Sequence, residues 1–156
     1  MNDRHTPIIA ELDKNMEDTI TFFRSLTPDE LSKQVYQDGA QWTVQQVLAH
    51  FITIERSMQW LFKNILAGGP GSPEGFDVER FNRTQPRKYD GQTIDALITK
   101  FRSVRNETLE IVGSMSDADL DREGRHAFHG HGKLQRFIIW AYEHVALHLE
   151  DLHQRL

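Results

Sequence analysis

The sequence predicts an all-α protein, a four-helix bundle with one long crossover between its second and third helices. Three observations support this fold class. Four stretches repeat apolar residues every three or four positions, which is the spacing of one face of a helix. Helix-capping residues stand where these stretches begin. One connection, residues 67–90, is much longer than the others, as a link between two parallel helices of a bundle must be.

The first helix is expected from Pro7 to about Ser25. Thr6 matches an N-cap, because Pro7 follows it at the first helical position. One face of this stretch is apolar and consists of Ile8, Ile9, Leu12, Met16, Ile20 and Phe23. A capping box of Thr27 and Glu30 then predicts a short helical turn.

A second capping box, Thr43 with Gln46, predicts the start of the second long helix. The apolar face of this helix consists of Val44, Val47, Leu48, Phe51, Ile54, Met58, Leu61, Phe62 and Ile65. His50 lies within that face, three residues after Val47 and four before Ile54. The segment Gly68-Gly69-Pro70 is expected to end the helix.

Residues 67–90 are the longest irregular stretch of the chain. Their glycine- and proline-rich first half is followed by a basic run that contains Arg80, Arg83, Arg87 and Lys88. We favour a crossover between parallel helices, and a lid over a pocket is the alternative, compatible with the first. A phosphate-binding loop is not predicted, because no Gly-Lys-Ser/Thr follows the glycines.

Thr93 is expected to cap the third helix, and the fourth is expected from about Lys133 to the end of the chain. Between them, Ser114 to Leu120 repeats the residue pattern of Ser25 to Leu31. Each copy precedes a helix that carries histidine, which suggests two helical-hairpin halves. Residues 121–133 are expected to form a polar loop.

Length and composition indicate one domain spanning residues 1–156. The apolar content of 38% and the charged content of 26% are typical of a globular protein. The net charge of −5 argues against a nucleic-acid surface, so we expect no nucleic-acid partner. The absence of cysteine excludes disulfides and protein thiolates. Without a signal sequence or an apolar run of ~20 residues, we expect a cytoplasmic protein and no membrane partner.

His144 and His148 are four residues apart on the fourth predicted helix. Residues at this spacing share a helix face with Cβ atoms ~5–6 Å apart, so both imidazoles can bind one ion at Zn–N distances of ~2.0–2.1 Å. The pair occupies positions of the apolar stripe, where unpartnered imidazoles are costly to bury and a shared metal removes that cost. The alternative is one exposed histidine and one hydrogen-bonded core histidine.

His50 is the expected third ligand. It lies seven residues after the cap of the second helix, and His148 lies about as far from the end of the fourth. If these two helices are antiparallel neighbours, the three histidines meet at one end of the bundle. Three protein ligands leave one coordination position for water or substrate, as in catalytic zinc sites.

The other histidine-based motifs are weaker. The histidines of the 121–133 segment are expected to be solvated, with a weak metal site of their own as the alternative; they are His126, His129 and His131. The zinc-protease motif His-Glu-x-x-His is not matched, because Val145 follows His144. The sequence also lacks the Gly-x-Ser-x-Gly elbow of serine hydrolases.

The chain resembles the DinB/YfiT-like metalloenzymes over essentially its whole length. The resemblance depends on Trp42-Thr43, on Val47-Leu48-Ala49-His50 and on His144-x-x-x-His148. It implies an up-down-down-up four-helix bundle that binds a divalent metal, zinc or nickel among others. One histidine of the second helix and two of the fourth are the ligands in this family. By motif match they correspond to His50, His144 and His148.

The resemblance also implies a chemistry, because characterised relatives are largely transferases or isomerases that use bacillithiol, mycothiol or glutathione, and often pair as dimers. We therefore expect a metal-dependent, low-molecular-weight-thiol S-transferase acting on a small-molecule substrate, with the metal activating a thiol or water. The alternatives are a metal-dependent hydrolase, a bundle stapled by a non-catalytic ion, and a small-molecule binding protein. Arg80, Arg83 and Arg87 are candidates for contact with a substrate carboxylate, but the favoured interpretation of each is a solvated surface charge. Glu55 and Glu143 are candidates for hydrogen bonds to the ligating histidines.

Overall fold

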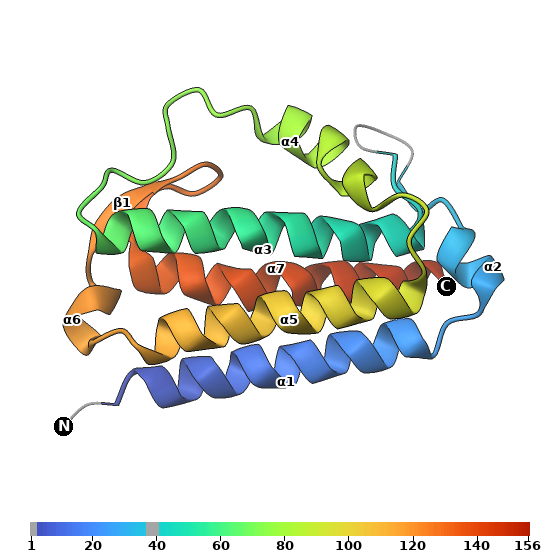
Figure 1. Cartoon of the computed structure of the whole chain (residues 1–156), viewed down its shortest axis with the longest axis horizontal. Coiled ribbons are helices and arrows are strands. Elements are labelled where there is room, and N and C mark those ends of the chain that lie inside the picture. The colour runs from blue at the N-terminus through green and yellow to red at the C-terminus, as the bar shows by residue number, and fades with distance from the viewer. Residues whose placement is uncertain (1–2, 37–40) are drawn as a thin grey trace.

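Four long helices form the bundle in the computed structural model, which describes residues 3–36 and 41–156. They are α1 (His5–Arg24), α3 (Val44–Leu66), α5 (Ile94–Gly113) and α7 (Leu134–Arg155). Figure 1 shows that α1 and α7 run in one direction and that α3 and α5 run in the other. Helices α1 and α3 each pack against both α5 and α7. The predicted fold class, a four-helix bundle in up-down-down-up order, is confirmed.

Side-chain caps explain where several helices begin. Thr43 accepts a hydrogen bond from the amide of Gln46 at the start of α3, and Thr93 accepts one from the amide of Ala96 at the start of α5. The start of α1 differs from the prediction of a Thr6 cap. The carboxylate of Asp3 instead accepts from the backbone amides of His5 and Thr6, at 3.2 and 3.1 Å. A carboxylate is favoured there, because it satisfies first-turn amides and faces the positive end of the helix dipole.

The two copies of the repeated segment are one-turn helices, α2 (Pro28–Ser32) and α6 (Asp117–Leu120). Each begins with a capping box and buries one leucine, Leu31 or Leu120. Figure 1 shows them at opposite ends of the bundle, where each follows a long helix. The repeated sequence pattern therefore specifies the same capped, one-turn helix twice.

The segment after α6 is a hairpin rather than the predicted polar loop. Strands β1 (Glu123–His126) and β2 (Gly130–Lys133) pair antiparallel, with Arg125 opposite His131. The strands contain three glycines and no apolar side chain, so the alternation that marks a strand is missing from the sequence. The hairpin is instead closed by the imidazole of His126, whose Nδ1 accepts from two backbone amides of the turn.

The crossover contains α4 (Val78–Thr84) and the 3-10 helix η1 (Pro86–Tyr89), and it passes over α3 (Figure 1). Its start is pinned to β1, because the Arg125 amide donates to the Pro70 carbonyl at 2.8 Å and the Ser72 amide donates to the Arg125 carbonyl at 2.7 Å. Gly71, between these bonds, has φ +90°, and a Cβ there would lie 2.4 Å from the Arg125 carbonyl oxygen. Only glycine fits this approach.

Two apolar clusters fill the bundle, one at each end. The first joins the end of α1, the start of α3, the start of α5 and the end of α7, and includes Phe23, Trp42, Phe51, Phe101 and Val145. The second, toward the hairpin, joins the opposite halves of the same helices. No helix in the described part of the chain is long and apolar enough to cross a membrane.

Candidate metal centre and its cavity

The antiparallel packing of α3 and α7 brings the three predicted ligands together. His50 of α3 lies 94 residues before His144 of α7, yet their Nε2 atoms are 3.2 Å apart. The Nε2 atoms of His144 and His148 are also 3.2 Å apart. One ring nitrogen of each of the three histidines lies within 4.8 Å of the others, the arrangement of a shared ion site.

The spacing and chemistry of these nitrogens fit a divalent ion. Two ligands at the tetrahedral angle with Zn–N bonds of ~2.0–2.1 Å are about 3.3 Å apart, close to both Nε2 separations. Imidazole nitrogen is a good ligand for zinc, nickel and copper. A neutral imidazole has only one N–H and one lone pair, so three Nε2 atoms that face one another cannot all be satisfied by mutual hydrogen bonds.

The proton of His148 is placed by Tyr36. The Tyr36 hydroxyl donates to Asp151 Oδ2 at 2.8 Å, so its oxygen is left to accept from His148 Nδ1 at 3.0 Å. Burial raises the pKa of Asp151, but the hydrogen bonds from Tyr36 and Arg155 together hold this pKa below its ordinary value. Asp151 is therefore ionised, His148 carries its proton on Nδ1, and its Nε2 lone pair faces the other imidazoles.

His50 and His144 are positioned by packing. The ring of His50 stacks on Trp42, with centroids 4.3 Å apart and planes at 28°. The ring of His144 packs against Trp140, with centroids 5.4 Å apart. Among the described residues, the Nδ1 atoms of His50 and His144 have no hydrogen-bond partner.

The two glutamates predicted to hydrogen-bond the ligands do not do so. Glu55 is buried against Arg105, and Glu143 pairs with Arg136 at the surface. The reason is geometric, because five residues along a helix turn a side chain by about 140° and one residue turns it by about 100°. Asp151, three residues after His148 and on its face of α7, was a better candidate from the sequence. Tyr36 has no comparable signal, because it lies in the connection before α3.

All three imidazoles of the cluster are neutral at pH 7. Burial, followed by the charges of His144 and His148, holds the pKa of His50 well below its ordinary value. Burial, His148 and His126 lower the pKa of His144 to about 3. Burial lowers the pKa of His148, and the nearby Asp151 opposes this shift. Neutral imidazoles keep the lone pair that a metal ion needs.

The cluster opens into a cavity of about 520 Å³, a size typical of small-molecule sites. Its walls come from α3, the crossover, the hairpin turn and α7, and they are mostly apolar. The apolar lining consists of Ile54, Met58, Trp60, Leu61, Pro73, Phe76, Val78, Phe81, Ala127, Phe128, Trp140 and Leu147. The crossover therefore also forms one wall of a pocket, which reconciles the two interpretations of residues 67–90.

The three crossover arginines are solvated surface charges, the interpretation that the sequence favours, and the alternative of a contact with a substrate carboxylate has no support in the cavity lining. Arg80, Arg83 and Arg87 are exposed on the outer surface of the crossover. Among the described residues, the lining contains no lysine or arginine, and Asp151 is its one carboxylate.

The loop histidines differ from one another. Only His131 is solvated as predicted, with its Nε2 3.5 Å from Glu123. His129 is half-buried with its ring edge against Trp140, and His126 is buried and lines the cavity. In the described part of the chain these three do not converge as metal ligands.

A sequence profile of the DinB superfamily matches residues 10–152. The chain belongs to the DinB superfamily. No match was found among curated proteins. Solved structures with this fold include YfiT from Bacillus subtilis, described as a probable metal-dependent hydrolase with an unusual four-helix bundle topology. YfiT has a TM-score of 0.76 and 17% identity, over 99% of this chain and 89% of YfiT.

Two further solved structures share the superfamily fold. An uncharacterised protein from Escherichia coli UTI89 has a TM-score of 0.72 and 16% identity, over 96% of this chain and 91% of that one. The colibactin self-resistance protein ClbS, in complex with a double-stranded DNA, has a TM-score of 0.73 and 15% identity, over 97% of this chain and 96% of ClbS.

ClbS corrects the expectation that this chain has no nucleic-acid partner. That expectation depended on the net charge of −5, yet a protein of the same fold is found with double-stranded DNA. Net charge is a sum over the whole surface, whereas phosphate contacts depend on local groups of basic side chains. The exclusion of nucleic acid from net charge is therefore wrong.

Proposed function

We propose that this DinB-superfamily protein is a metal-dependent enzyme in which His50, His144 and His148 hold one divalent ion, zinc or nickel. The observation that carries the proposal is the convergence of three neutral imidazoles at the wall of an apolar cavity. Structural zinc sites use four protein ligands, whereas catalytic sites use three and leave a position for water or substrate. Three ligands beside a cavity therefore support catalysis over a metal staple.

When bound, the ion would lower the pKa of a water or thiol and so supply a nucleophile at neutral pH. The residues of the chain have separate parts in this chemistry. The Tyr36–Asp151 pair holds the proton of His148 on Nδ1, which keeps Nε2 free as a ligand. The mostly apolar walls make the surroundings of the cluster less polar than water, which strengthens electrostatic interactions there.

The cavity lining favours hydrolysis of an uncharged, apolar molecule. Glutathione and other thiols that carry carboxylates need a cationic side chain, and the described lining offers none. YfiT, which shares 17% identity with this chain, is described as a probable metal-dependent hydrolase, and that description agrees with this preference. Thiol S-transferase activity stays a prediction of the sequence and is included in the test.

The test begins with the metal content of untagged protein, measured by elemental analysis after loading with zinc or nickel. We expect the wild type and the His131→Ala variant to hold one equivalent and the His148→Ala variant to hold almost none. His131 is the matched control, because it is an exposed histidine outside the cluster. If His131→Ala loses metal and His148→Ala keeps it, the site is misplaced.

Activity is then assayed on neutral aryl esters, with and without glutathione. We expect ester hydrolysis without thiol and a loss of at least about 100-fold when the metal is removed. Turnover only in the presence of a thiol would restore the S-transferase prediction. Inactivity toward every substrate, together with unfolding on metal removal, would support a metal staple instead.

A further inference from the structure

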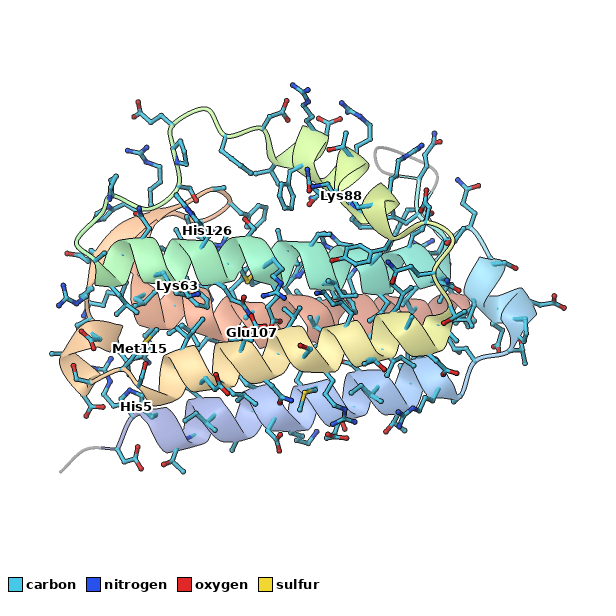
Figure 2. The ribbon with its side chains drawn as sticks, in the orientation of Figure 1. His5, Lys63, Lys88, Glu107, Met115 and His126 are labelled. Carbon is cyan, nitrogen blue, oxygen red and sulfur yellow. The ribbon has the colours of Figure 1, made fainter. Side chains whose placement is uncertain are left out.

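His126 is a buried histidine of the cavity wall that the proposed metal chemistry does not use. It stands at the end of β1, is 7% exposed and contributes to the cavity lining. Figure 2 labels it on the hairpin, where the hairpin passes across α3 in this view. Its ring packs against Phe137, with centroids 5.0 Å apart. Its position in the wall is therefore set by α7 on one side and by its own turn on the other.

The backbone of the hairpin turn fixes which ring nitrogen of His126 carries the proton. Nδ1 accepts hydrogen bonds from the amides of Phe128 and His129, at 3.0 and 3.1 Å. A nitrogen that faces two donors cannot carry a proton of its own, so the proton of the neutral ring is on Nε2. Burial, followed by the charges of His129 and Arg136, lowers the pKa of His126 to about 4. The ring is therefore neutral at pH 7.

The Nε2–H group is a donor without a partner. No residue in the described part of the chain accepts a hydrogen bond from it, and it is not among the fully enclosed nitrogens. Because the turn amides bind Nδ1, the edge of the ring that carries Nε2 points away from the turn. His126 and His144 line the same cavity. A molecule bound there beside the three-histidine cluster shares the cavity with this N–H.

We propose that His126 is a substrate-binding residue whose neutral Nε2–H donates a hydrogen bond to the carbonyl oxygen of an uncharged, apolar substrate. This inference deepens the proposed function and rests on it for the identity of the reaction, but not for the hydrogen bond itself. The hydrogen bond polarises the carbonyl group and so favours nucleophilic attack on its carbon, and no proton is transferred. A neutral imidazole suits this part, because it donates without adding a charge to an apolar cavity. The rest of the substrate packs on the apolar wall, which includes Trp140 and Phe128.

Two substitutions separate the binding role of His126 from its structural role. In His126→Asn the side-chain oxygen replaces Nδ1 as the acceptor for the turn, while the cavity donor is lost. In His126→Gln the longer amide reaches the position of Nε2 as a donor, while the acceptor for the turn is lost. The first variant should therefore keep the hairpin turn, with loss of only the ring contact with Phe137, but bind substrate less well. The second should melt at a lower temperature but keep more of the binding.

The experiment measures binding of acetophenone and ethylbenzene to the metal-free protein by tryptophan fluorescence, since Trp60 and Trp140 line the cavity. The two probes have nearly the same size and differ in one carbonyl oxygen. We expect His126→Asn to weaken acetophenone binding by about threefold to tenfold, the effect of one hydrogen bond, and to leave ethylbenzene binding unchanged. His126→Gln should bind acetophenone more tightly than His126→Asn does. Nitrogen NMR of wild type should place the proton on Nε2 and show its signal moving with acetophenone.

Three results would overturn the proposal. These are an equal change for both probes in His126→Asn, a proton on Nδ1, and no saturable binding of acetophenone to wild type. Because the measurement uses metal-free protein, it is independent of the metal site. If acetophenone binds through His126 and the protein holds no metal, the proposed function fails and the present inference stands. If the protein is a metal-dependent hydrolase and the probes bind without His126, only the inference fails.

Discussion

Helix α3 contributes one residue to each of two groups of buried polar side chains. The two groups lie on different faces of the helix and differ in charge, in hydrogen bonding and in access to the cavity. His50 faces α7 and belongs to the histidine cluster. Glu55, five residues later and about 140° around the helix, faces α5. Its carboxylate accepts hydrogen bonds from Arg105 Nε at 2.9 and 3.0 Å and from the Thr108 hydroxyl at 2.8 Å. Both members of the ion pair are almost fully buried.

The Arg105 network is a charge-balanced structural unit, in which Arg105 Nη2 alone of the guanidinium nitrogens has no hydrogen-bond partner among the described residues. Arg105 Nη1 donates to the Leu12 carbonyl at 2.8 Å and to Asn15 Oδ1 at 3.0 Å, so the guanidinium ties α1 to α3 and α5. Its charge is balanced by Glu55, and neither residue lines the cavity. The histidine cluster, by contrast, gathers three neutral groups of the same kind whose lone pairs face one another beside a cavity.

The comparison shows that burial of polar side chains does not by itself mark a functional site. Both groups are buried, and both connect helices that are distant in sequence. They differ because the charges of one are balanced within the fold by an ion pair, whereas the other keeps three neutral ligand atoms beside open volume, available to something that is not protein. Three predictions test this distinction, in order of decreasing effect.

The histidine region should make the metal-free protein sensitive to acid. Burial and neighbouring groups lower the pKa of His126 to about 4 and that of His144 to about 3, from an ordinary value of 6.5. The unfolded chain therefore takes up protons near pH 6.5, before the folded chain does. The free energy of unfolding should be constant above this pH and should fall below it, by about 1.4 kcal/mol per pH unit for each imidazole. Two such groups together remove about 7 kcal/mol by pH 4, which is comparable to the whole stability of a marginally stable domain.

Thermal melting of metal-free protein between pH 8 and pH 4 measures this effect. His144→Leu removes one titrating imidazole, so its melting temperature should fall less steeply with acid than that of wild type. A wild-type melting temperature that is constant down to pH 5 would mean that these imidazoles are not held neutral in the folded protein.

Loss of Arg105 should destabilise the fold without touching the metal site. Arg105→Ala leaves the Glu55 carboxylate buried without a counter-ion, which typically costs about 3–5 kcal/mol. Denaturant unfolding measures the loss, and zinc binding to the folded fraction should equal that of wild type. The double variant Arg105→Met with Glu55→Leu removes both charges and should recover much of the stability, because an apolar pair of similar volume can replace a buried ion pair. Weaker zinc binding in the double variant would show that the two groups are coupled through α3.

The contrast also explains how much of the molecule the sequence predicts. The long helices, their caps at Thr43 and Thr93 and the convergence of His50 with α7 follow from local periodicity and from antiparallel packing. The periodicity and the caps depend on residues a few positions apart, which is why they are visible in one sequence, whereas the convergence also needed the inferred antiparallel packing. Metal binding by the three histidines, a single domain over residues 1–156 and a cytoplasmic location stay predictions.

The features that were missed depend on tertiary placement. The hairpin has no apolar alternation, and Tyr36 reaches His148 only because the chain between α2 and α3 returns to the end of α7. The burial of Arg105 could have been predicted from the sequence, because Arg105 lies four residues after Phe101 and three before Thr108 on the buried stripe of α5. A charged residue at such a position predicts a buried partner. Its partner is Glu55, which the sequence indicates only as a candidate for a hydrogen bond to a ligating histidine.

The smallest of the three effects concerns the hydrogen bond that joins the histidine cluster to the rest of the fold. Tyr36→Phe removes the acceptor for His148 Nδ1–H and the donor to Asp151, while the ring can keep its edge contact with Trp42, at a centroid distance of 5.9 Å. Loss of such a partner typically weakens metal affinity by about 10–100-fold. Competition with a chelator measures this change, and His131→Ala should show none. Unaltered affinity in Tyr36→Phe would mean that His148 does not need Tyr36 to present its Nε2 lone pair. The histidine cluster would then be positioned by packing alone, and the distinction from the hydrogen-bonded Arg105 network would be sharper than proposed.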